Sequence, residues 1–341
     1  MKQYLKLVAD GQYLTASQAE AVILSIMRGE ATPAEIAGLL MGLRSRGESI
    51  DELEGCVRAM RACALSIQVD DPNAIDLCGT GGDQLGTFNI STTACFVAAG
   101  AGATVAKHGN RSVSSNSGSA DVLESLGVHT TLEAEGVEKC IRDTGVGFLF
   151  APAFHPALRH VMPVRRALGV RTMFNIMGPM CNPANVSRQL IGVFDKNVAR
   201  MMAEILLRLG SEHVITVHAD DGLDEITLTG TTTLFEARRG TAGIKETVFD
   251  PADFGFDRVE PAALQGGSAD ENAEILLDVL SGSTGAQRDI VILNAAFALL
   301  IAGHATDIKP CLAAAAESID SGAARQKLDA LARATQLLQA A

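Results

Sequence analysis

The stretch AIDLCGTGGD, residues 74–83, joins a short apolar run to a turn rich in glycine. The apolar run predicts a buried strand, so the turn lies at the carboxyl end of a strand, where α/β proteins bind ligands. Glycines leave backbone N–H groups uncovered, and such a turn can hold phosphate oxygens. It matches neither GxxxxGK[ST] nor GxGxxG, because Gln84 stands in the place of the third glycine. On the glycines alone, a phosphate loop and a plain strand–helix turn are equally good interpretations.

Strands alternate with helices after this stretch, which predicts parallel βαβ units with both faces of the sheet covered. The predicted elements are a helix from about Ser91, a strand at residues 104–106, a helix at 119–126, a strand at 147–150, helices at 155–168 and 197–207, and a strand at 213–217. Alternating Thr and Leu over residues 226–235 predicts a hairpin at the sheet edge. Roughly the last seventy residues are predicted to be helical.

The residues before the glycine-rich turn carry helix-start signals. Capping boxes begin at Ser17, Thr32 and Ser49, each with a glutamate three positions later. The sequence therefore predicts an α/β protein with a small N-terminal helical domain over residues 1–70 and a large α/β domain over residues 71–341. The large domain is expected to hold a central, mostly parallel sheet flanked by helices. A chain of 341 residues fits this division, because single cores stop growing at about 250–300 residues.

The composition argues against several classes of protein. Lys and Arg number 28 against 40 Asp and Glu, and the net charge of −12 disfavours non-specific nucleic-acid binding, which needs a basic surface. The seven cysteines form no C-x-x-C pair, so neither a disulfide framework nor a zinc site is expected. The apolar run at residues 290–303 is too short to span a bilayer, and the N-terminus lacks a signal peptide pattern. We therefore expect a soluble protein of the reducing cytoplasm.

Polar and basic residues follow the glycine-rich turn. Asn-Ile-Ser-Thr at residues 89–92 brings hydroxyls to a helix N-terminus, where free amides favour anions, although Ser91 is also interpretable as a simple helix cap. KHGNR at residues 107–111 follows the second predicted strand, and a serine-rich segment comes after it. Within an acidic protein, this basic and hydroxyl-rich group predicts a pocket for a polyphosphate.

Two further groups carry possible chemistry. The acidic run DDGLDE at residues 220–225 follows a predicted strand, where carboxylates can hold Mg²⁺ beside a polyphosphate, but a solvated loop is the better interpretation of the pattern alone. The second group joins APAFHP at residues 151–156 to Arg165 and Arg166. An arginine grips a carboxylate with two donors, and adjacent helical residues diverge by about 100°, so at most one should face a cleft. The histidines at 129, 213 and 304 are interpreted as structural.

Together these segments resemble the anthranilate phosphoribosyltransferase family over nearly the whole chain. The matching stretches are GEATP at residues 29–33, GTGGD at 79–83, residues 89–92, 107–111 and 117–124, His155 with Pro156, NIMGP at 175–179, residues 182–183, and DGLDE at 221–225. Their order and spacing make the resemblance specific. It implies a helical domain through which family members dimerise, and a segment at residues 155–185 that packs back onto that domain and lines the cleft.

The resemblance also implies roles by position. Residues implied to bind phosphoribosyl pyrophosphate (PRPP) are Gly79, Gly82, Asp83, Thr87, Asn89, Ile90, Ser91, Thr92, Lys107, His108, Gly109, Asn110, Arg111, Ser112, Val113, Ser114, Ser115 and Ser119. Those implied to contact anthranilate are Gly79, Asn110, His155 and Arg165. Ser91, Asp224 and Glu225 would hold Mg²⁺, and Lys107 and His108 are the catalytic candidates.

The implied reaction transfers the phosphoribosyl group of PRPP to the amine of anthranilate, with release of pyrophosphate, in tryptophan biosynthesis. Mg²⁺, loop amides and Lys107 would stabilise the charge that builds on the leaving pyrophosphate. A pyrimidine nucleoside phosphorylase and a nucleic-acid-binding relative are the alternatives. The pyrophosphate-type loop and the Asp224–Glu225 pair disfavour the first, and the net charge of −12 disfavours the second. The expected partners are therefore the two small substrates and a second copy of the chain, without nucleic acid or membrane.

Overall fold

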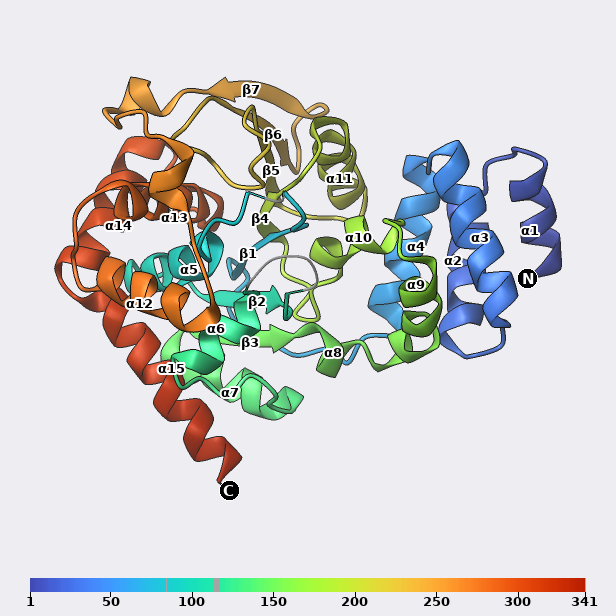
Figure 1. The fold of residues 1–341 in the computed structure, drawn as a ribbon, viewed down its shortest axis with the longest axis horizontal. Coiled ribbons are helices and arrows are strands. Elements are labelled where there is room, and N and C mark those ends of the chain that lie inside the picture. The colour runs from blue at the N-terminus through green and yellow to red at the C-terminus, as the bar shows by residue number, and fades with distance from the viewer. Residues whose placement is uncertain (84, 113–116, 341) are drawn as a thin grey trace.

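A small bundle of helices lies against a larger body built around one sheet (Figure 1). This computed structural model describes residues 1–83, 85–112 and 117–340. The predicted fold class is confirmed, because helices come first and a mostly parallel sheet flanked by helices follows. No helix in these described ranges has both the length and the apolar character needed to cross a membrane.

The N-terminal bundle is built from short, capped helices. They are α1 (Lys2–Ala9), α2 (Ala16–Met27), α3 (Pro33–Arg46) and α4 (Ile50–Ala62). The capping boxes at Thr32 and Ser49 are confirmed. The box predicted at Ser17 is wrong, because Thr15 caps α2 and exchanges hydrogen bonds with Gln18, which leaves Ser17 inside the helix. Each of these boxes satisfies amides that the first helical turn leaves without partners.

The sheet has the strand order β3-β2-β1-β4-β5-β6-β7. Its strands are β1 (Ile75–Gly79), β2 (Val105–Gly109), β3 (Val146–Phe150), β4 (Arg188–Gly192), β5 (His213–Ala219), β6 (Thr232–Arg238) and β7 (Lys245–Phe249). The pairings from β3 to β5 are parallel, and β6 and β7 add antiparallel pairings at one edge. The chain passes from β1 outward to β2 and β3, then returns to β4 on the other side of β1. The carboxyl ends of β1 and β4 therefore flank a topological switch point, where open α/β sheets bind ligands.

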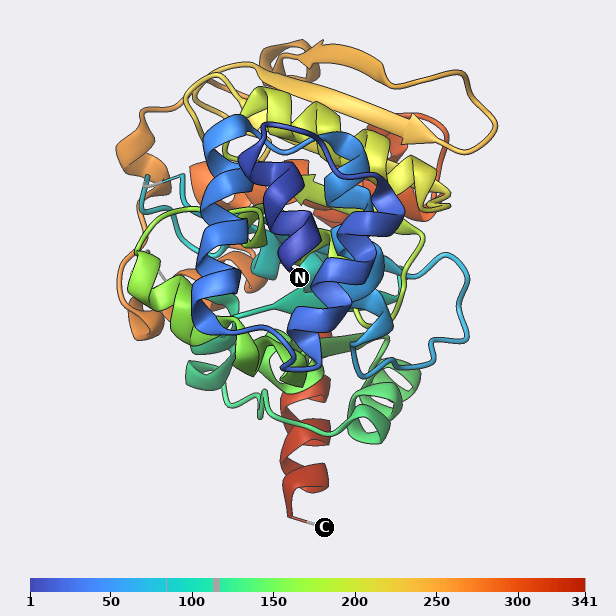
Figure 2. The same cartoon turned by 90° about the vertical axis from the view of Figure 1, so that its right-hand side faces the viewer.

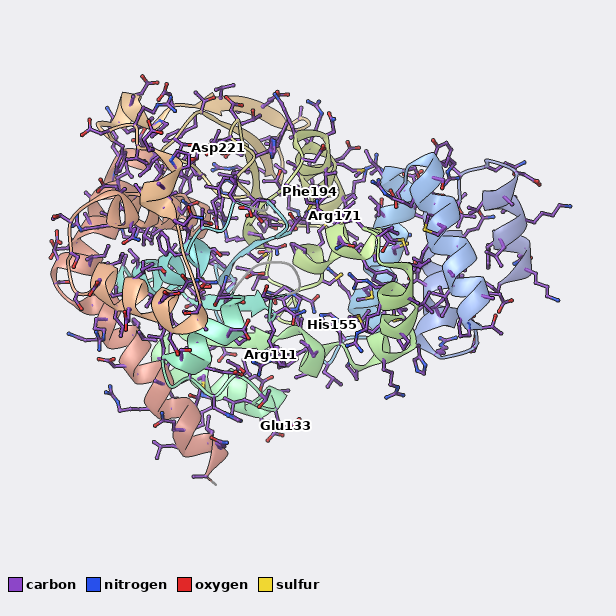
Figure 3. All side chains as sticks on the ribbon, in the orientation of Figure 1. Arg111, Glu133, His155, Arg171, Phe194 and Asp221 are labelled. Carbon is purple, nitrogen blue, oxygen red and sulfur yellow. The ribbon has the colours of Figure 1, made fainter. Side chains whose placement is uncertain are left out.

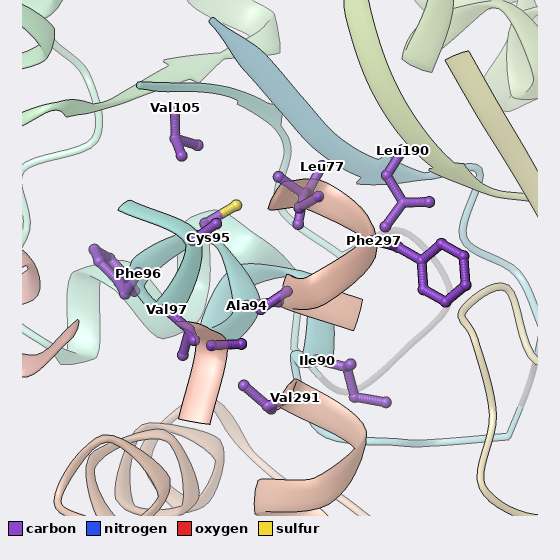
Figure 4. Packing of buried hydrophobic residues seen from close by; sticks show 14 of the residues in the cluster. Leu77, Ile90, Ala94, Cys95, Phe96, Val97, Val105, Leu190, Val291 and Phe297 are labelled. Atoms are coloured by element: carbon purple, nitrogen blue, oxygen red, sulfur yellow. The ribbon is translucent and has the colours of Figure 1, made fainter. Parts of the chain in front are cut away.

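Helices from the C-terminal part cover one face of the sheet. The helices between β1 and β6 are α5 (Ile90–Gly100), α6 (Ser119–Ser125), α7 (Ala134–Thr144), α8 (Ala151–Phe154), η1 (Pro156–His160), α9 (Met162–Leu168), α10 (Phe174–Met177), η2 (Gly178–Cys181) and α11 (Lys196–Arg208). After β7 come η3 (Pro251–Phe254), η4 (Pro261–Leu264), α12 (Ala269–Leu280), α13 (Ala286–Ala302), α14 (Ile308–Asp320) and α15 (Ala323–Gln339). Figure 4 shows α5 with Leu77 and Val105 of the sheet on one side and Val291 of α13 on the other, whereas Leu190 of the sheet lies beside Phe297 of α13. Buried residues of α5 and α13 therefore share one hydrophobic core with these strands.

Three predicted elements differ from the structure. Lys107 and His108 lie inside β2 rather than after it. The edge hairpin is formed by β6 and β7, not by residues 226–235, because Asn294 of α13 bonds both the amide and the carbonyl of Ile226 and holds that segment in a buried turn. The helix predicted at residues 155–168 is divided into η1 and α9, where Pro156 and Pro163 interrupt the hydrogen-bond pattern.

The segment between β3 and β4 packs against the N-terminal bundle. Val161, Val164 and Met173 belong to the same hydrophobic core as the bundle helices, and the Sγ of Cys56 in α4 lies 3.7 Å from the Sδ of Met173. Figure 2 shows this green segment beside the blue helices, in front of the sheet. The chain thus leaves the sheet after β3, contacts the bundle, and returns at β4.

Candidate active site

The glycine-rich turn begins where β1 ends. The amide of Thr80 donates to the carbonyl of Gly192 at the end of β4, which keeps the turn at the switch point. Gly82 has a φ of +83°, a left-handed conformation that side-chain-bearing residues rarely adopt. A Cβ on Gly79 would lie 2.7 Å from Oδ2 of Asp224, so the carboxylate occupies the space that a side chain would need. Both glycines are therefore required for geometric reasons.

Two carboxylates from the segment after β5 face this turn. Oδ2 of Asp224 accepts a hydrogen bond from the amide of Gly81 at 2.7 Å, and Oε1 of Glu225 accepts one from the amide of Ser91 at 3.1 Å. Asp224 is 9% exposed, so the solvated-loop interpretation is wrong for this residue, whereas Asp220 and Asp221 at the start of the acidic run are exposed. Ser91 is not the helix cap either, because Asn89 precedes α5 and Ser91 lies in its first turn.

The pKa values of both carboxyl groups are high. Burial, followed by the nearby charge of Asp83, raises the pKa of Asp224 to about 7. Burial, followed by the charge of Asp224, raises the pKa of Glu225 to about 8, although Lys107 and the Ser91 hydroxyl act in the opposite direction. Buried carboxylates are costly unless a cation compensates them. The pair therefore has the character of a cation site.

The donor set fits Mg²⁺. Two carboxylates and the hydroxyl of Ser91 are hard oxygen ligands, which Mg²⁺ prefers, and it is commonly held by one or two carboxylates together with substrate phosphates. Among the described residues no group of three His, Cys, Asp or Glu side chains is placed to hold a metal. The remaining ligands would have to come from the substrate and from water.

Lys107 lies buried beneath the same strand ends. Its Nζ donates to the carbonyl of Leu77 at 2.5 Å, and its charge acts on both Asp76 and Glu225. Asp76 is fully buried in β1, where its carboxylate accepts hydrogen bonds from the amide of His108 and from Nδ2 of Asn182. Burial raises the pKa of Asp76 despite these partners. Asp76 is thus an internal anchor for the strand that carries Lys107 and His108.

Two histidine rings meet beside the lysine. The ring centroids of His108 and His155 lie 5.2 Å apart, and both Nε2 atoms are buried without a hydrogen-bond partner in the described chain. Burial lowers the pKa of His108 to about 3 and that of His155 to about 4. Both imidazoles are therefore neutral near pH 7, and each leaves one ring nitrogen without a partner among the described residues.

The two neighbouring arginines of α9 differ, as predicted from the helical spacing. Arg165 is half-buried, with its guanidinium carbon 5.3 Å from the ring centre of Phe174, whereas Arg166 is exposed. Burial lowers the pKa of Arg165. Arg165 has no ion pair among the described residues, so its charge is available to an anionic ligand.

Several other predicted residues are occupied by contacts within the chain. Arg111 forms ion pairs with Asp121 and Glu124 of α6, and Ser119 bonds both backbone groups of Asn110. The remaining positions lie along the turn and the start of α5 or in β2: Asp83, Thr87, Asn89, Ile90, Thr92 and Gly109. The amide of Ser112 donates to Asp121, and Val113, Ser114 and Ser115 lie outside the described residues.

The sequence analysis missed three polar residues at this site. Asp76 is a charged residue inside an apolar strand, which was a usable signal. Asn182 stands in one of the stretches that carry the resemblance, but its role was not assigned. Arg171 carried no signal. The contacts of these two residues with Asp76 and Gly82 join segments far apart in the chain. Arg171 follows α9, and its Nη2 donates to the carbonyl of Gly82 at 2.6 Å.

Comparisons with known proteins agree with this geometry. The model of the glycosyl transferase family α/β domain matches residues 71–325, and that of the family's helical bundle domain matches residues 2–64. The anthranilate phosphoribosyltransferase of Salinibacter ruber is 56% identical over 97% of each chain. The chain belongs to the anthranilate phosphoribosyltransferase family.

Solved structures of this family superpose on the whole chain. The enzyme from Thermus thermophilus matches with a TM-score of 0.91 and 40% identity, covering 98% of this chain and 99% of its own. The Saccharomyces cerevisiae enzyme, solved in complex with PRPP and Mg, matches with a TM-score of 0.88 and 28% identity, covering 98% and 97%. Membership of the anthranilate phosphoribosyltransferase family thus extends over the helical bundle, the sheet and the candidate site.

Proposed function

We propose that this chain transfers the phosphoribosyl group of PRPP to the amine of anthranilate and releases pyrophosphate. The observation that carries the proposal is the hydrogen bond from the amide of Gly81 to Asp224. It joins a glycine-rich turn suited to phosphates to a buried carboxylate pair suited to a cation, at the switch point of the sheet. Family membership supports the same reaction.

The donor half of the site would be formed by the turn and the start of α5. Gly79, Gly82 and Asp83 would present backbone to the pyrophosphate, and the hydroxyls of Ser91 and Thr92 would add donors. Asp224, Glu225 and Ser91 would hold Mg²⁺, which when bound would neutralise negative charge on the departing pyrophosphate. Lys107, whose ammonium is held by the carbonyl of Leu77, would stabilise the same charge from β2.

The acceptor half would be formed by β2 and the segment that packs on the bundle. Arg165 would bind the carboxylate of anthranilate, and Gly79, Asn110 and His155 would line its ring and amine. His108 and His155 are neutral, so their Nε2 atoms can hydrogen-bond without repelling an approaching cationic centre. The site would then work by alignment, because the amine must lie in line with C1 of the ribose. The alkylated aryl amine loses its proton readily, so no dedicated base is assigned.

A fluorescence assay tests this function. Purified protein is mixed with PRPP, Mg²⁺ and anthranilate, and the emission of anthranilate is followed with time. Decay that requires all three components supports the proposal. The same protein is offered a pyrimidine nucleoside and phosphate. Phosphorolysis of the nucleoside without decay of anthranilate emission would show that the chain is a nucleoside phosphorylase instead.

Three properties implied by the resemblance belong to the same proposal. The helical domain of residues 1–70 would form the interface of a homodimer, residues 155–185 would line the cleft between it and the α/β domain, and the enzyme would work in the cytoplasm. The seven cysteines are free, which suits a reducing compartment. Light scattering after size-exclusion chromatography tests the dimer, and a monomeric mass at micromolar concentration would contradict it.

A further inference from the structure

Arg171 occupies an unusual position for an exposed arginine. It follows α9, on the acceptor-side segment, yet its Nη2 donates to the carbonyl of Gly82 in the glycine-rich turn at 2.6 Å. Its guanidinium carbon also lies 4.8 Å from the ring centre of Phe194, which follows β4 (Figure 3). Arg171 therefore contacts the loops after both strands that flank the switch point. A Cβ on Gly82 would lie only 2.7 Å from the same Nη2.

The hydrogen bond fixes the orientation of one peptide group. In a trans peptide the C=O and the following N–H point in opposite directions. Because Arg171 holds the carbonyl of Gly82, the amide of Asp83 is directed away from the guanidinium. Within the described residues this amide donates to no other backbone group. It is therefore an oriented donor at the turn.

The same arginine has no carboxylate partner in the part of the chain that the structure describes, which contrasts with Arg111 and its two acidic neighbours. A guanidinium carries five donors, and only one is used by Gly82. Stacking on Phe194 holds the planar group in place without neutralising it. The uncompensated charge thus stays beside the turn.

The acceptor-side segment also connects Arg171 to the helical bundle. Met173, two residues further on, lies in the core of the bundle and contacts Cys56 of α4. Met173 and Arg171 therefore connect the helical bundle to the glycine-rich turn. Phe194 strengthens this connection, because its amide donates to the hydroxyl of Thr80 in the same turn.

We propose that Arg171 is a positioning residue for PRPP, which orients the Gly82–Asp83 peptide toward the phosphates from the acceptor-side segment. This rests on the proposed function. Arg171 acts on the donor substrate although it lies beside the acceptor site. Arg165 and Arg171, six positions apart, thus serve different substrates.

Steady-state kinetics of Arg171→Ala, Arg171→Lys and the exposed neighbour Arg166→Ala test the proposal. Loss of a hydrogen bond from a charged donor predicts a roughly ten- to hundred-fold rise in KM for PRPP in Arg171→Ala. The KM for anthranilate and the melting temperature should stay near those of the parent. Arg171→Lys, which keeps one charged donor, should recover part of the loss, and Arg166→Ala should behave like the parent.

A second measurement separates positioning from simple packing. Phe194→Leu removes the stacking surface but leaves the arginine, so it should raise the KM for PRPP less than Arg171→Ala does. The double variant should be no worse than Arg171→Ala, because the two side chains act as a unit. An unchanged KM for PRPP in Arg171→Ala, equal effects on both substrates, or a lowered melting temperature without a change in KM would overturn the proposal. A parent protein that does not consume anthranilate would instead refute the proposed function. In that case, titration with Mg²⁺ and pyrophosphate would still compare the affinity of the parent and of Arg171→Ala for the pyrophosphate group.

Discussion

The amide of Gly81 donates to Oδ2 of Asp224 across 2.7 Å, although the two residues are 143 positions apart. One belongs to the turn after β1 and the other to the segment after β5. The contact joins the glycine-rich turn and the carboxylate pair in one structure, so a change at either should affect the same substrate. It also explains why Asp224 is buried although it stands in an acidic run that resembles a surface loop.

The first prediction concerns the carboxylate pair. The double variant Asp224→Asn, Glu225→Gln should lose at least about a hundred-fold in turnover, since removal of one electrostatic group alone costs about that much in other enzymes. Its melting temperature without Mg²⁺ should equal or exceed that of the parent, because two buried carboxylates become neutral amides. Calorimetry with and without Mg²⁺ and PRPP checks this.

Ligands that bind only the folded state raise its stability. The parent should therefore gain stability on addition of Mg²⁺ with PRPP, and the double variant should gain far less. Turnover within a few-fold of the parent would remove Asp224 and Glu225 from the metal site.

The second prediction concerns pH and the two buried histidines. In the folded protein the pKa values are about 3 for His108 and about 4 for His155, whereas an unfolded histidine titrates near about 6.5. Between these values each of the two histidines binds a proton in the unfolded chain but not in the folded protein, so its contribution to the free energy of unfolding falls as the pH falls from about 6.5 toward 4. The loss approaches roughly 1.4 kcal/mol per pH unit for each histidine.

Urea unfolding at several pH values measures this slope. His155→Gln should show a shallower fall than the parent, whereas the exposed His304→Gln should keep the slope of the parent. Carboxylates elsewhere contribute equally to all three proteins. Identical slopes for the parent and His155→Gln would mean that His155 takes up its proton over the same pH range in the folded and the unfolded protein, which contradicts the lowered pKa.

Local signals predicted much of the fold. The capping boxes at Thr32 and Ser49 depend on residues three positions apart, and the strand that ends at Gly79 depends on a short apolar run. The sequence alone therefore predicts the two helix starts and this strand. The break in the helix expected at residues 155–168 also has a local cause in the sequence, because Pro156 and Pro163 stand in this stretch.

The long-range part of the site could not be predicted in this way. Asn182 lies 106 positions from its partner Asp76, and Arg171 lies 89 positions from Gly82. No local pattern distinguishes such residues from surface ones. The burial of Asp224 likewise follows from the close approach of β4, where a Cβ on Gly192 would collide with the Asp224 backbone. Only the packed sheet reveals these contacts.

The third prediction concerns Gly82. Alanine at this position would adopt a strained φ of +83° and crowd the guanidinium of Arg171, so Gly82→Ala should raise the KM for PRPP more than that for anthranilate. Gly210→Ala is the matched control, since Gly210 has a φ of +94° with open space around it, far from the turn in sequence. Both variants should lose similar stability, of the order of 1 kcal/mol. Unchanged affinity of Gly82→Ala for PRPP, measured by titration, would contradict the assignment of the turn.

The fourth prediction separates the two substrates through Arg165. Arg165 is half-buried over Phe174 without an ion pair in the described residues, so its charge is available to an anionic ligand. A hydrogen bond to a charged partner contributes about 1.5–3 kcal/mol, and Arg165→Ala should raise the KM for anthranilate roughly ten- to a hundred-fold. The KM for PRPP should change far less, which is the reverse of the pattern expected for Arg171→Ala.

Arg166→Ala is the control, because this exposed neighbour points elsewhere on α9. A larger anthranilate defect in Arg166→Ala, or a defect of Arg165→Ala confined to PRPP, would move the acceptor site away from Arg165.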